Sequence, residues 1–279
     1  MVLRSYSAYP QVDLSALKTM WFQSYRRKSP KPISYMTKIS VLCLLIAFMA
    51  SNKPAMSQQK ITFPAKDGLE VTADLYFLSS EKPYVILFHQ ARYSRGEYNE
   101  IAPKIVNLGY NCLAVDLRSG NEVNGVKNET AQRAREKGLP TDYIHAIADI
   151  EGALKYVKSQ TDLPFILWGS SYSASLVLVQ AAKDLRTRAV IAFSPGEYFE
   201  KSDFVSSQIQ NISVPVLVLS SKGECSSVKE LVSSIKNQKL VTQYCPSERG
   251  RHGSSALWKL NPSNKDYWLA LTMFFNKIK

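Results

Sequence analysis

Residues 163–173, LPFILWGSSYS, decide the fold of this chain. The run is mostly apolar as far as residue 168, which is typical of a strand buried on both faces of a sheet. Gly169 and Ser173 lie two residues before and two residues after Ser171, and an apolar helical pattern follows at once. Small residues at these two positions allow a sharp turn between a strand and a helix. The stretch therefore predicts a strand–turn–helix unit with Ser171 as a candidate nucleophile; the alternative is a serine that only caps the helix.

The same alternation of strands and helices continues on both sides of this unit. Short apolar runs predict buried strands, and segments with apolar residues at helical spacing predict helices. The expected strands are residues 61–64, 70–77, 84–88, 112–115, 165–168, 189–193, 214–219 and 240–244, and the expected helices are residues 142–158, 172–184, 226–236 and 264–278. Lys66-Asp67-Gly68 is a hairpin signal. The pattern predicts one α/β domain over residues 58–279, with helices on both faces of a mostly parallel sheet of about eight strands and an antiparallel hairpin at its start.

The composition is that of a globular enzyme or binding protein. With 45% hydrophobic residues and 21% charged residues, the chain is neither disordered, collagen-like nor a coiled coil. The formal net charge is +12, but residues 1–57 hold eight basic residues and a single acid, Asp13. More than half of the excess therefore belongs to this segment. The mildly basic remainder gives no reason to expect nucleic acid as a partner.

Residues 1–57 are expected to be a leader. Residues 39–50, ISVLCLLIAFMA, are apolar but shorter than the roughly 20 residues that span a bilayer. Lys38 precedes this run, and Ala55-Met56-Ser57 follows it as a small-residue cleavage pattern. These features predict a signal peptide over residues 36–57 and export to the periplasm or the extracellular space, with residues 1–35 as an upstream extension if translation begins at Met36.

Four other interpretations of the leader stay open, of which one is a longer basic leader. Residues 39–50 could remain as an uncleaved membrane anchor, with the basic residues before them on the cytoplasmic side. Residues 1–35 could instead recruit the protein to anionic lipid. The apolar run could also be a buried helix of the domain.

The cysteines indicate a disulfide rather than a metal site. Cys225 and Cys245 follow two successive expected strands and could meet, which an oxidising compartment would permit. Cys112 lies in an apolar run and is expected to be buried. The cysteines and the three histidines lack the spacing of a zinc site, so no metal is expected.

A nucleophilic serine needs a base, and the chain offers His89, His145 and His252. His252 lies in a loop between Gly250 and Gly253, after the last expected strand, where a base could reach the serine. His89 ends a strand and is expected beside the oxyanion loop, whereas His145 lies on the polar side of a helix. The sequence therefore predicts that His252 is the base.

The base needs a carboxylate to orient it, and Glu224 lies just past the end of an expected strand. Glu197 and Asp203, after the preceding strand, are the alternatives. The order Ser171, Glu224, His252 along the chain is the order found in α/β-hydrolases. Two backbone N–H groups should stabilise an oxyanion: that of Tyr172, and that of Gln90 as first choice or Ala91 as second, both in the loop after residues 84–88.

These motifs and their spacing over residues 60–279 resemble the dienelactone-hydrolase-like group of α/β-hydrolases. Asp116-Leu117-Arg118 also resembles a structural loop of that superfamily. The resemblance implies a sheet with strand order 1-2-4-3-5-6-7-8 and neither a metal nor an organic cofactor. Dienelactone hydrolases use a cysteine nucleophile, so Ser171 at this position favours ordinary ester chemistry.

The expected substrate pocket is open. Many relatives carry a lid in the interval that corresponds to residues 194–213, which here has room for one short helix, so no large lid is expected. The irregular loop over residues 120–140 should line the acyl or alcohol pocket. The other expected pocket residues are Arg92, Tyr93, Glu97 and Tyr98. Arg92 and Arg95 could bind a substrate carboxylate.

The function expected from these features is that of an exported serine hydrolase that cleaves a small carboxylic ester through an acyl-enzyme intermediate. Thioesters, amides and sugar esters are further substrate classes that the motifs allow. An acyltransferase would differ only in the acceptor that replaces water. The alternative outside enzymology is a non-catalytic exported binding protein on a hydrolase scaffold, because a fold by itself does not imply a function.

Overall fold

A computed structural model describes residues 57–279 of the chain. The expected leader over residues 1–57 lies outside the described residues, apart from Ser57. The same holds for its signal peptide over residues 36–57 and for the alternative anchor over residues 39–50. Within the described part of the chain, no helix combines the length and the apolar composition that crossing a bilayer requires.

The main sheet has eight strands in the order β1-β2-β4-β3-β7-β8-β9-β10. Its strands are β1 (Ser57–Pro64), β2 (Glu70–Phe77), β3 (Tyr84–Phe88), β4 (Asn111–Val115), β7 (Phe165–Ser170), β8 (Thr187–Phe193), β9 (Val216–Leu219) and β10 (Val241–Tyr244). β2 pairs antiparallel with both β1 and β4, and the other neighbours are parallel. Counted along this sheet alone, the order is 1-2-4-3-5-6-7-8, so the expected α/β-hydrolase topology is confirmed.

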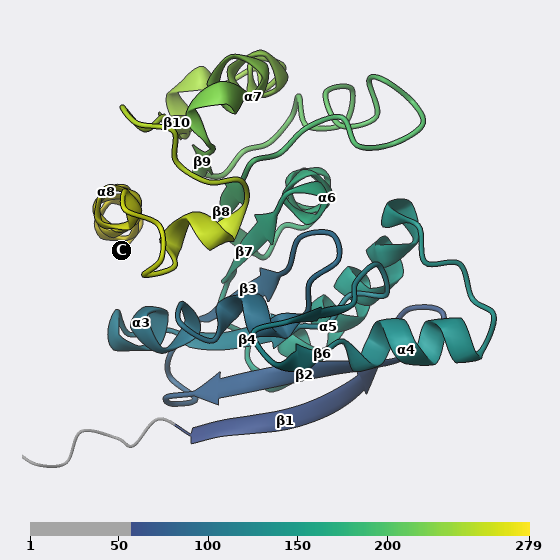
Figure 1. The fold of residues 1–279 in the computed structure, drawn as a ribbon. Helices are drawn as coiled ribbons and strands as arrows, with labels where there is room; N and C mark the ends of the chain where they lie inside the picture. Colours follow the sequence, from purple (N-terminus) through teal and green to yellow (C-terminus); the bar gives the residue numbers. More distant parts are fainter. Residues whose placement is uncertain (1–56) are drawn as a thin grey trace, which may run out of the picture. The chain divides into compact units, whose positions relative to one another are not determined.

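Helices cover both faces of the sheet (Figure 1). The α-helices are α3 (Ala102–Asn107), α4 (Glu129–Glu136), α5 (Ile147–Gln160), α6 (Tyr172–Ala181), α7 (Cys225–Val232) and α8 (Asn264–Lys277), and the 3-10 helices are η1 (Arg95–Tyr98), η2 (Tyr143–Ala146), η3 (Lys222–Glu224), η4 (Gln238–Leu240) and η5 (Ser254–Leu257). One core joins α4, α5, α6 and α7 to the sheet, and the other joins α3 and α8 to it.

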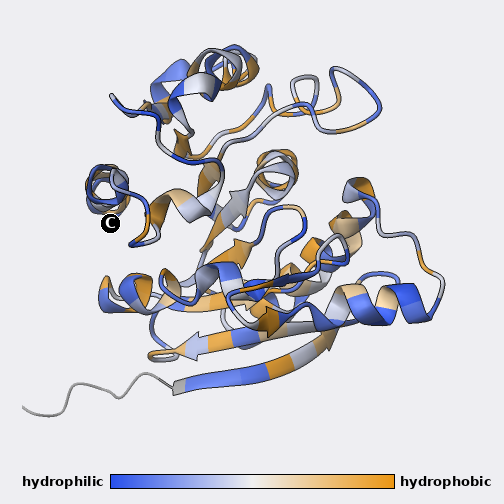
Figure 2. Cartoon of the chain, viewed as in Figure 1, coloured by the Kyte–Doolittle hydropathy of each residue, from blue (hydrophilic) through white to orange (hydrophobic). Residues whose placement is uncertain are grey.

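The two cores explain the apolar runs of the sequence. Phe88 of β3 enters the first core and Leu87 enters the second, because neighbouring side chains of a strand point to opposite faces. A central strand covered on both faces therefore needs apolar residues throughout. In Figure 2 the central strands are largely orange, whereas the outer strand β1 begins blue.

Residues 120–140 do not form the irregular loop that was expected. They contain a small hairpin of β5 (Glu122–Val123) and β6 (Val126–Lys127), followed by α4. The hairpin turns at Asn124 and Gly125, whose φ angles are +52° and +73°. An Asn-Gly pair is a strong hairpin signal, but the strands beside it are only two residues long and carry little apolar pattern.

The helix α4 was missed because its sequence is almost wholly polar. Of its residues, only Ala131 and Ala134 are both apolar and buried. Its ends do carry recognisable signals. The Asn128 side chain accepts a hydrogen bond from the Ala131 N–H at 2.8 Å, and Gly138 adopts a positive φ of +64° beyond the last turn.

The arginine of the Asp116-Leu117-Arg118 segment braces the loop after β4. The Arg118 guanidinium lies 2.7 Å from the Asp67 carboxylate in the β1–β2 turn and 2.8 Å from the Asp149 carboxylate in α5. Because Arg118 is almost fully buried, removal of either partner would leave part of a charge unpaired in the interior. The segment therefore has the structural role that the resemblance implies.

Cys225 and Cys245 form a disulfide, with their Cα atoms 5.9 Å apart. The bridge joins the first residue of α7 to the residue that follows β10. Cys112 is buried and free, as expected. The interval over residues 194–213 contains neither a helix nor a strand, so no large lid is present there.

Candidate active site

Ser171 lies on a strained turn between β7 and α6. Its φ is +62°, in the left-handed region that a residue with a side chain rarely adopts. A Cβ atom on Gly169 would lie 2.4 Å from the Ala174 Cα, so this position tolerates only glycine. The Ser173 hydroxyl accepts a hydrogen bond from the Ser170 N–H at 2.9 Å and lies 2.8 Å from the Phe88 carbonyl oxygen. Ser173 therefore fits the tight turn because it is small, and its hydroxyl also links the turn to β3 by a hydrogen bond.

Glu224 and His252 are in contact. The Glu224 Oε1 and His252 Nδ1 atoms form a short hydrogen bond. The other carboxylate oxygen, Oε2, accepts hydrogen bonds from the Ser221 N–H at 2.9 Å, the Ser221 hydroxyl at 2.7 Å and the Ser194 hydroxyl at 2.8 Å. Burial would raise the pKa of Glu224, but the bonds from His252 and Ser221 outweigh it and lower the pKa to about 2. Glu224 is therefore held as an oriented carboxylate at neutral pH.

The His252 loop packs directly against the nucleophile turn. The Ser254 N–H donates to the Ser170 hydroxyl at 2.8 Å, and the Gly253 N–H donates to the Ser194 hydroxyl at 3.1 Å. The Ser171 N–H in turn donates to the Phe193 carbonyl at 2.7 Å. Among the described residues no hydrogen bond joins Ser171 directly to His252; such bonds often tighten only when substrate is bound.

The alternative acids and bases have other partners. The Glu197 carboxylate accepts the N–H groups of residues 205 and 206, both at 2.8 Å, and Asp203 pairs with Lys201 at 3.1 Å. His145 is exposed and lies 3.7 Å from the Asp142 carboxylate. Among the described residues, none of these hydrogen bonds and ion pairs reaches the Ser171 turn.

His89 is buried and fixed beside the loop that follows β3. Its Nδ1 atom lies 2.8 Å from the Gln90 carbonyl oxygen, and its Nε2 atom accepts the Leu117 N–H at 2.8 Å. Burial lowers the pKa of His89 to about 4, so the ring is neutral at physiological pH. A neutral ring that donates from Nδ1 and accepts at Nε2 orders this loop and the loop after β4.

For the second oxyanion donor, the contacts of the two N–H groups favour Ala91 over Gln90. The Gln90 N–H, the first choice, already donates to the Glu97 carboxylate at 2.8 Å. The Ala91 N–H, the second choice, has no acceptor among the described residues. The Tyr172 N–H opens α6, and the first N–H groups of a helix have no partner within it. Ala91 and Tyr172 are thus the two candidates with free N–H groups.

Glu97 does not line a pocket, contrary to expectation, but lies fully buried behind the candidate site. Its carboxylate also accepts the Ser170 hydroxyl at 2.8 Å. Burial raises the pKa of Glu97 to about 7, although bonds from the Gln90 N–H and the Ser170 hydroxyl oppose the shift. Glu97 thereby joins the loop after β3 to the nucleophile turn, a connection between distant residues that no local pattern could indicate.

Tyr98 and Arg95 are also unavailable to a substrate. Tyr98 is fully buried and donates its hydroxyl to the Phe88 carbonyl at 2.6 Å. Arg95 is buried and pairs with Asp116 at 2.6 Å and with Asp74 at 3.0 Å. Both residues occupy the interior because η1 turns them inward, beneath the loop that was expected to present them.

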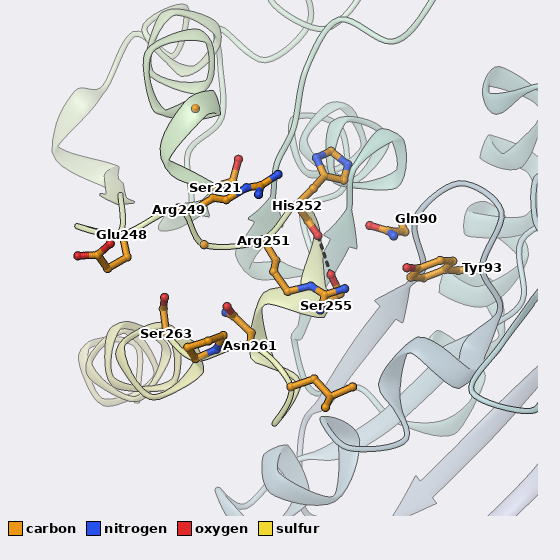
Figure 3. A pocket seen from close by; sticks show the side chains of 14 residues that line it. Gln90, Tyr93, Ser221, Glu248, Arg249, Arg251, His252, Ser255, Asn261 and Ser263 are labelled. Carbon is orange, nitrogen blue, oxygen red and sulfur yellow. Dashed lines mark hydrogen bonds between the residues drawn. The ribbon is translucent and has the colours of Figure 1, made fainter.

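Tyr93 and His252 line a polar cavity of about 930 Å³. Figure 3 shows Gln90 and Tyr93 on one side of His252, while Arg249 and Glu248 lie toward the other. The Tyr93 ring stacks on Trp258 at a centroid distance of 5.9 Å, which leaves its edge on the cavity. Arg92 instead lines a smaller cavity of about 220 Å³, together with Tyr143.

A second large cavity, of about 640 Å³, was not anticipated. We call it the aromatic cleft, after four of its lining side chains, which are Tyr143, Tyr198, Phe199 and Phe204. Two of these residues, Tyr198 and Phe199, follow the carboxyl end of β8, which is the edge of the sheet where ligands bind in α/β folds. The position of these two residues after β8 is the sequence feature from which the cleft could have been predicted.

No cluster of three or more histidine, cysteine or acidic side chains within residues 57–279 could hold a metal ion. The polar groups around Ser171 are instead those of acid–base and nucleophilic chemistry. They comprise a hydroxyl, an imidazole that bonds a carboxylate, and free backbone N–H groups.

Comparison with known proteins identifies the family and the fold of this chain. Residues 74–243 match the sequence model of the dienelactone hydrolase family. An esterase of Pyrococcus furiosus is 16% identical, with a TM-score of 0.58 over 80% of this chain and 90% of that one. A dienelactone hydrolase of Anabaena variabilis is 15% identical, with a TM-score of 0.59 over 78% and 96% of the two chains. A hyperthermophilic esterase of Pyrobaculum calidifontis is 14% identical, with a TM-score of 0.53 over 94% and 98%.

The structural likeness shows the shared fold, and the family match covers more than half of the chain. Because of this family match, the chain belongs to the dienelactone hydrolase family of α/β-hydrolases. It is a hydrolase of ester bonds. No curated protein sequence matches significantly.

Proposed function

We propose that the protein cleaves a small carboxylic ester through an acyl-enzyme intermediate on Ser171. The observation that carries this proposal is the contact between His252 Nδ1 and Glu224, in a loop that packs on the residue before Ser171. Because Glu224 accepts the proton on Nδ1, the Nε2 atom of the neutral ring is free to accept a proton. Glu224 thus sets the tautomer that general-base catalysis needs.

In the first step, His252 Nε2 takes the proton of the Ser171 hydroxyl while the oxygen attacks the carbonyl carbon of the ester. The carbonyl oxygen becomes an oxyanion, which accepts hydrogen bonds from the Tyr172 and Ala91 N–H groups. The bond to the leaving oxygen then breaks, and His252 gives its proton to the departing alcohol. Ser171 is left carrying the acyl group.

Water completes the reaction by the same route. His252 removes a proton from water, the hydroxide oxygen attacks the acyl carbon, and the oxyanion forms again. The bond to Ser171 breaks, the acid leaves, and the serine oxygen recovers its proton from His252. Glu224 stays ionised throughout, in keeping with its pKa of about 2.

The direct test is hydrolysis of p-nitrophenyl acetate by the wild type, Ser171→Ala and His252→Ala. Each substitution should lower kcat/KM by at least about 10³-fold. Ser159→Ala, in an exposed serine at the end of α5, is the matched control and should keep the wild-type value. Equal activity in the wild type and Ser171→Ala would contradict the serine mechanism. An inactive wild type would contradict the proposed cleavage of small carboxylic esters.

We also propose that the protein is exported. Support comes from the signal-peptide pattern of residues 36–57 and from the disulfide between Cys225 and Cys245, a bond typical of oxidising compartments. β1 begins at Ser57, so cleavage after this residue would remove only the first residue of the described fold.

A further inference from the structure

The aromatic cleft reaches the nucleophile turn through Tyr198 and Tyr143. The Tyr198 hydroxyl donates to the Ser194 carbonyl at 2.8 Å. Burial raises the pKa of Tyr198 to about 12, and the Ser171 side chain partly opposes this shift. Tyr143 stacks on Tyr172, which directly follows Ser171, at a centroid distance of 4.4 Å. Two walls of the cleft therefore touch the turn that carries the hydroxyl.

The cleft presents aromatic surface to solvent. Tyr143 and Tyr198 are 38% and 36% exposed. Phe199 and Phe204 pack against each other with ring centroids 4.6 Å apart and form another part of the wall. Exposed ring faces stack favourably on a further planar ring.

The charges around the cleft do not favour an anion. Lys201 pairs with Asp203 at 3.1 Å, and His145 faces Asp142 at 3.7 Å. Glu200 adds one negative charge at the lining. A neutral group therefore suits the cleft better than a carboxylate or a phosphate.

The position of His252 decides which half of the ester enters this cleft. His252 must protonate the leaving alcohol, so the alcohol lies on its side of Ser171. His252 lines the polar cavity with Gln90 and Arg251, and this cavity shares no lining residue with the aromatic cleft. The alcohol half belongs with the polar cavity, and the acyl half is left for the aromatic cleft.

We propose that the aromatic cleft binds a neutral aromatic ring in the acyl half of the substrate, so that the preferred substrates are arylalkanoyl or arylalkenoyl esters. The ring packs among Tyr143, Tyr198 and Phe204, which line the cleft, while the ester carbonyl lies at Ser171. This inference rests on the proposed function, because it assumes that Ser171 takes up the acyl group.

The experiment compares acyl groups on one leaving group. We would measure kcat/KM for p-nitrophenyl 3-phenylpropanoate and p-nitrophenyl hexanoate, since kcat/KM reports the acylation step in both cases. The wild type should prefer the aryl ester by at least about five-fold, the scale of one aromatic contact. Tyr143→Leu and Phe204→Leu should each lower the rate with the aryl ester by a similar factor, and the rate with the hexanoate by less than about two-fold.

The matched control is Tyr156→Leu, which makes the same change in a tyrosine that stacks on Phe63 in β1 and lines neither cavity. Its ratio of the two rates should equal that of the wild type. Unfolding midpoints of all variants identify any that fail to fold, and having two cleft variants keeps the test decisive if one of them does.

The outcomes separate this proposal from the proposed function. If p-nitrophenyl acetate is cleaved through Ser171 but the wild type and both cleft variants treat the aryl and alkyl esters alike, the aromatic-acyl proposal is wrong and the serine hydrolase stands. If Ser171→Ala cleaves acetate as fast as the wild type, both proposals are wrong. A preference for the aryl ester that only the cleft variants lose supports both.

Discussion

At the scale of single residues, the carboxylate of Glu224 is the group on which the orientation of His252 depends. It receives three hydrogen bonds on Oε2 and presents Oε1 to the imidazole. Orientation of this kind contributes to the rate rather than to substrate binding, because it matters most when the imidazole carries a positive charge.

We therefore expect Glu224→Gln to lower kcat by about 10³- to 10⁴-fold with little change in KM. A glutamine can hold the ring in the wrong tautomer and cannot balance the charge on the imidazolium. Steady-state kinetics on p-nitrophenyl acetate measure the effect. Glu197→Gln, at the alternative acid, is the control and should lose less than about three-fold. A larger loss in Glu197→Gln than in Glu224→Gln would reverse the assignment of the acid.

Glu97 gives a second prediction, in the dependence of stability on pH. Its pKa is about 7 in the folded protein and 4.5 in its ordinary state, so between these values the folded chain binds more protons. The stability that Glu97 contributes is therefore fully present below pH 4.5 and is lost as pH rises to 7. His89, with its pKa lowered to about 4, has the opposite slope.

Comparison with Glu97→Gln isolates this effect, because His89 is common to both proteins. The difference in unfolding free energy, wild type minus variant, should fall by about 3 kcal/mol between pH 4.5 and pH 7. Urea titrations at four pH values within this range measure it. Parallel curves for the two proteins would show that Glu97 ionises normally.

At the scale of the elements, the site depends on how closely the His252 loop approaches the nucleophile turn. A Cβ atom on Gly253 would lie 2.1 Å from the Gln90 side-chain oxygen and 2.6 Å from the Ser170 hydroxyl. Gly253 also has a positive φ of +68°. The loop and the turn are therefore in contact because residue 253 has no side chain.

Gly253→Ala should displace His252 and lower kcat by at least about ten-fold, as small misplacements of catalytic groups do. Gly109→Ala is a matched control, because Gly109 also has a positive φ, +99°, but has open space around it. The control should lose about 1–2 kcal/mol of stability, because alanine is strained at a positive φ, while keeping its kcat. Equal kcat values for the two variants would mean that the close approach of the loop is not needed.

The sequence predicts the elements of the sheet well but the contacts between distant elements poorly. The strands could be predicted because they are buried on both faces, and Ser171 because its turn needs Gly169 and a helix directly behind it. The occupation of the Gln90 N–H by Glu97 could not be predicted, since it depends on η1 folding back beneath the loop. Local propensity does not encode such a tertiary contact.

The pocket residues were also predicted poorly, because their positions depend on contacts between distant elements. Tyr98 and Arg95 lie in the segment that was expected to face the substrate, but a 3-10 helix turns both into the interior. The aromatic cleft takes its walls from residues more than 50 positions apart, at Tyr143 and Tyr198. Its formation depends on how two loops come together at the sheet edge, which a single sequence does not specify.

At the scale of the whole molecule, the disulfide joins the two segments that supply the acid and the base. Cys225 directly follows Glu224, and Cys245 lies at the start of the segment that leads to His252. Lys222 and Arg249 add a backbone hydrogen bond between the same two segments at 3.0 Å. The bridge therefore limits how far these segments can separate.

We expect the double variant Cys225→Ser/Cys245→Ser to lose about 3 kcal/mol of unfolding free energy, because the unfolded chain is no longer closed into a loop. Chemical denaturation measures this loss, and Cys112→Ala, in the free buried cysteine, is the control for loss of a thiol. The wild type should lose a similar amount under reducing conditions, whereas the double variant should not respond. Equal sensitivity of the two proteins to a reductant would contradict a structural bridge.

Export can be tested on the same molecule. Expression of the full chain in a bacterium, followed by N-terminal sequencing of the fractionated product, should yield a protein that begins at Gln58 and contains no free thiol at Cys225 or Cys245. A product that keeps residues 39–50 and stays with the membrane fraction would instead support the uncleaved anchor.

The most direct test of the central claim is covalent labelling of the folded protein with a fluorophosphonate, which reacts with a serine only when a neighbouring base activates it. Mass spectrometry should find a single adduct, on Ser171, that is absent from Ser171→Ala and from heat-denatured protein, and that forms far more slowly in Glu224→Gln. An unlabelled protein, or an adduct on another serine such as Ser170, would contradict the account.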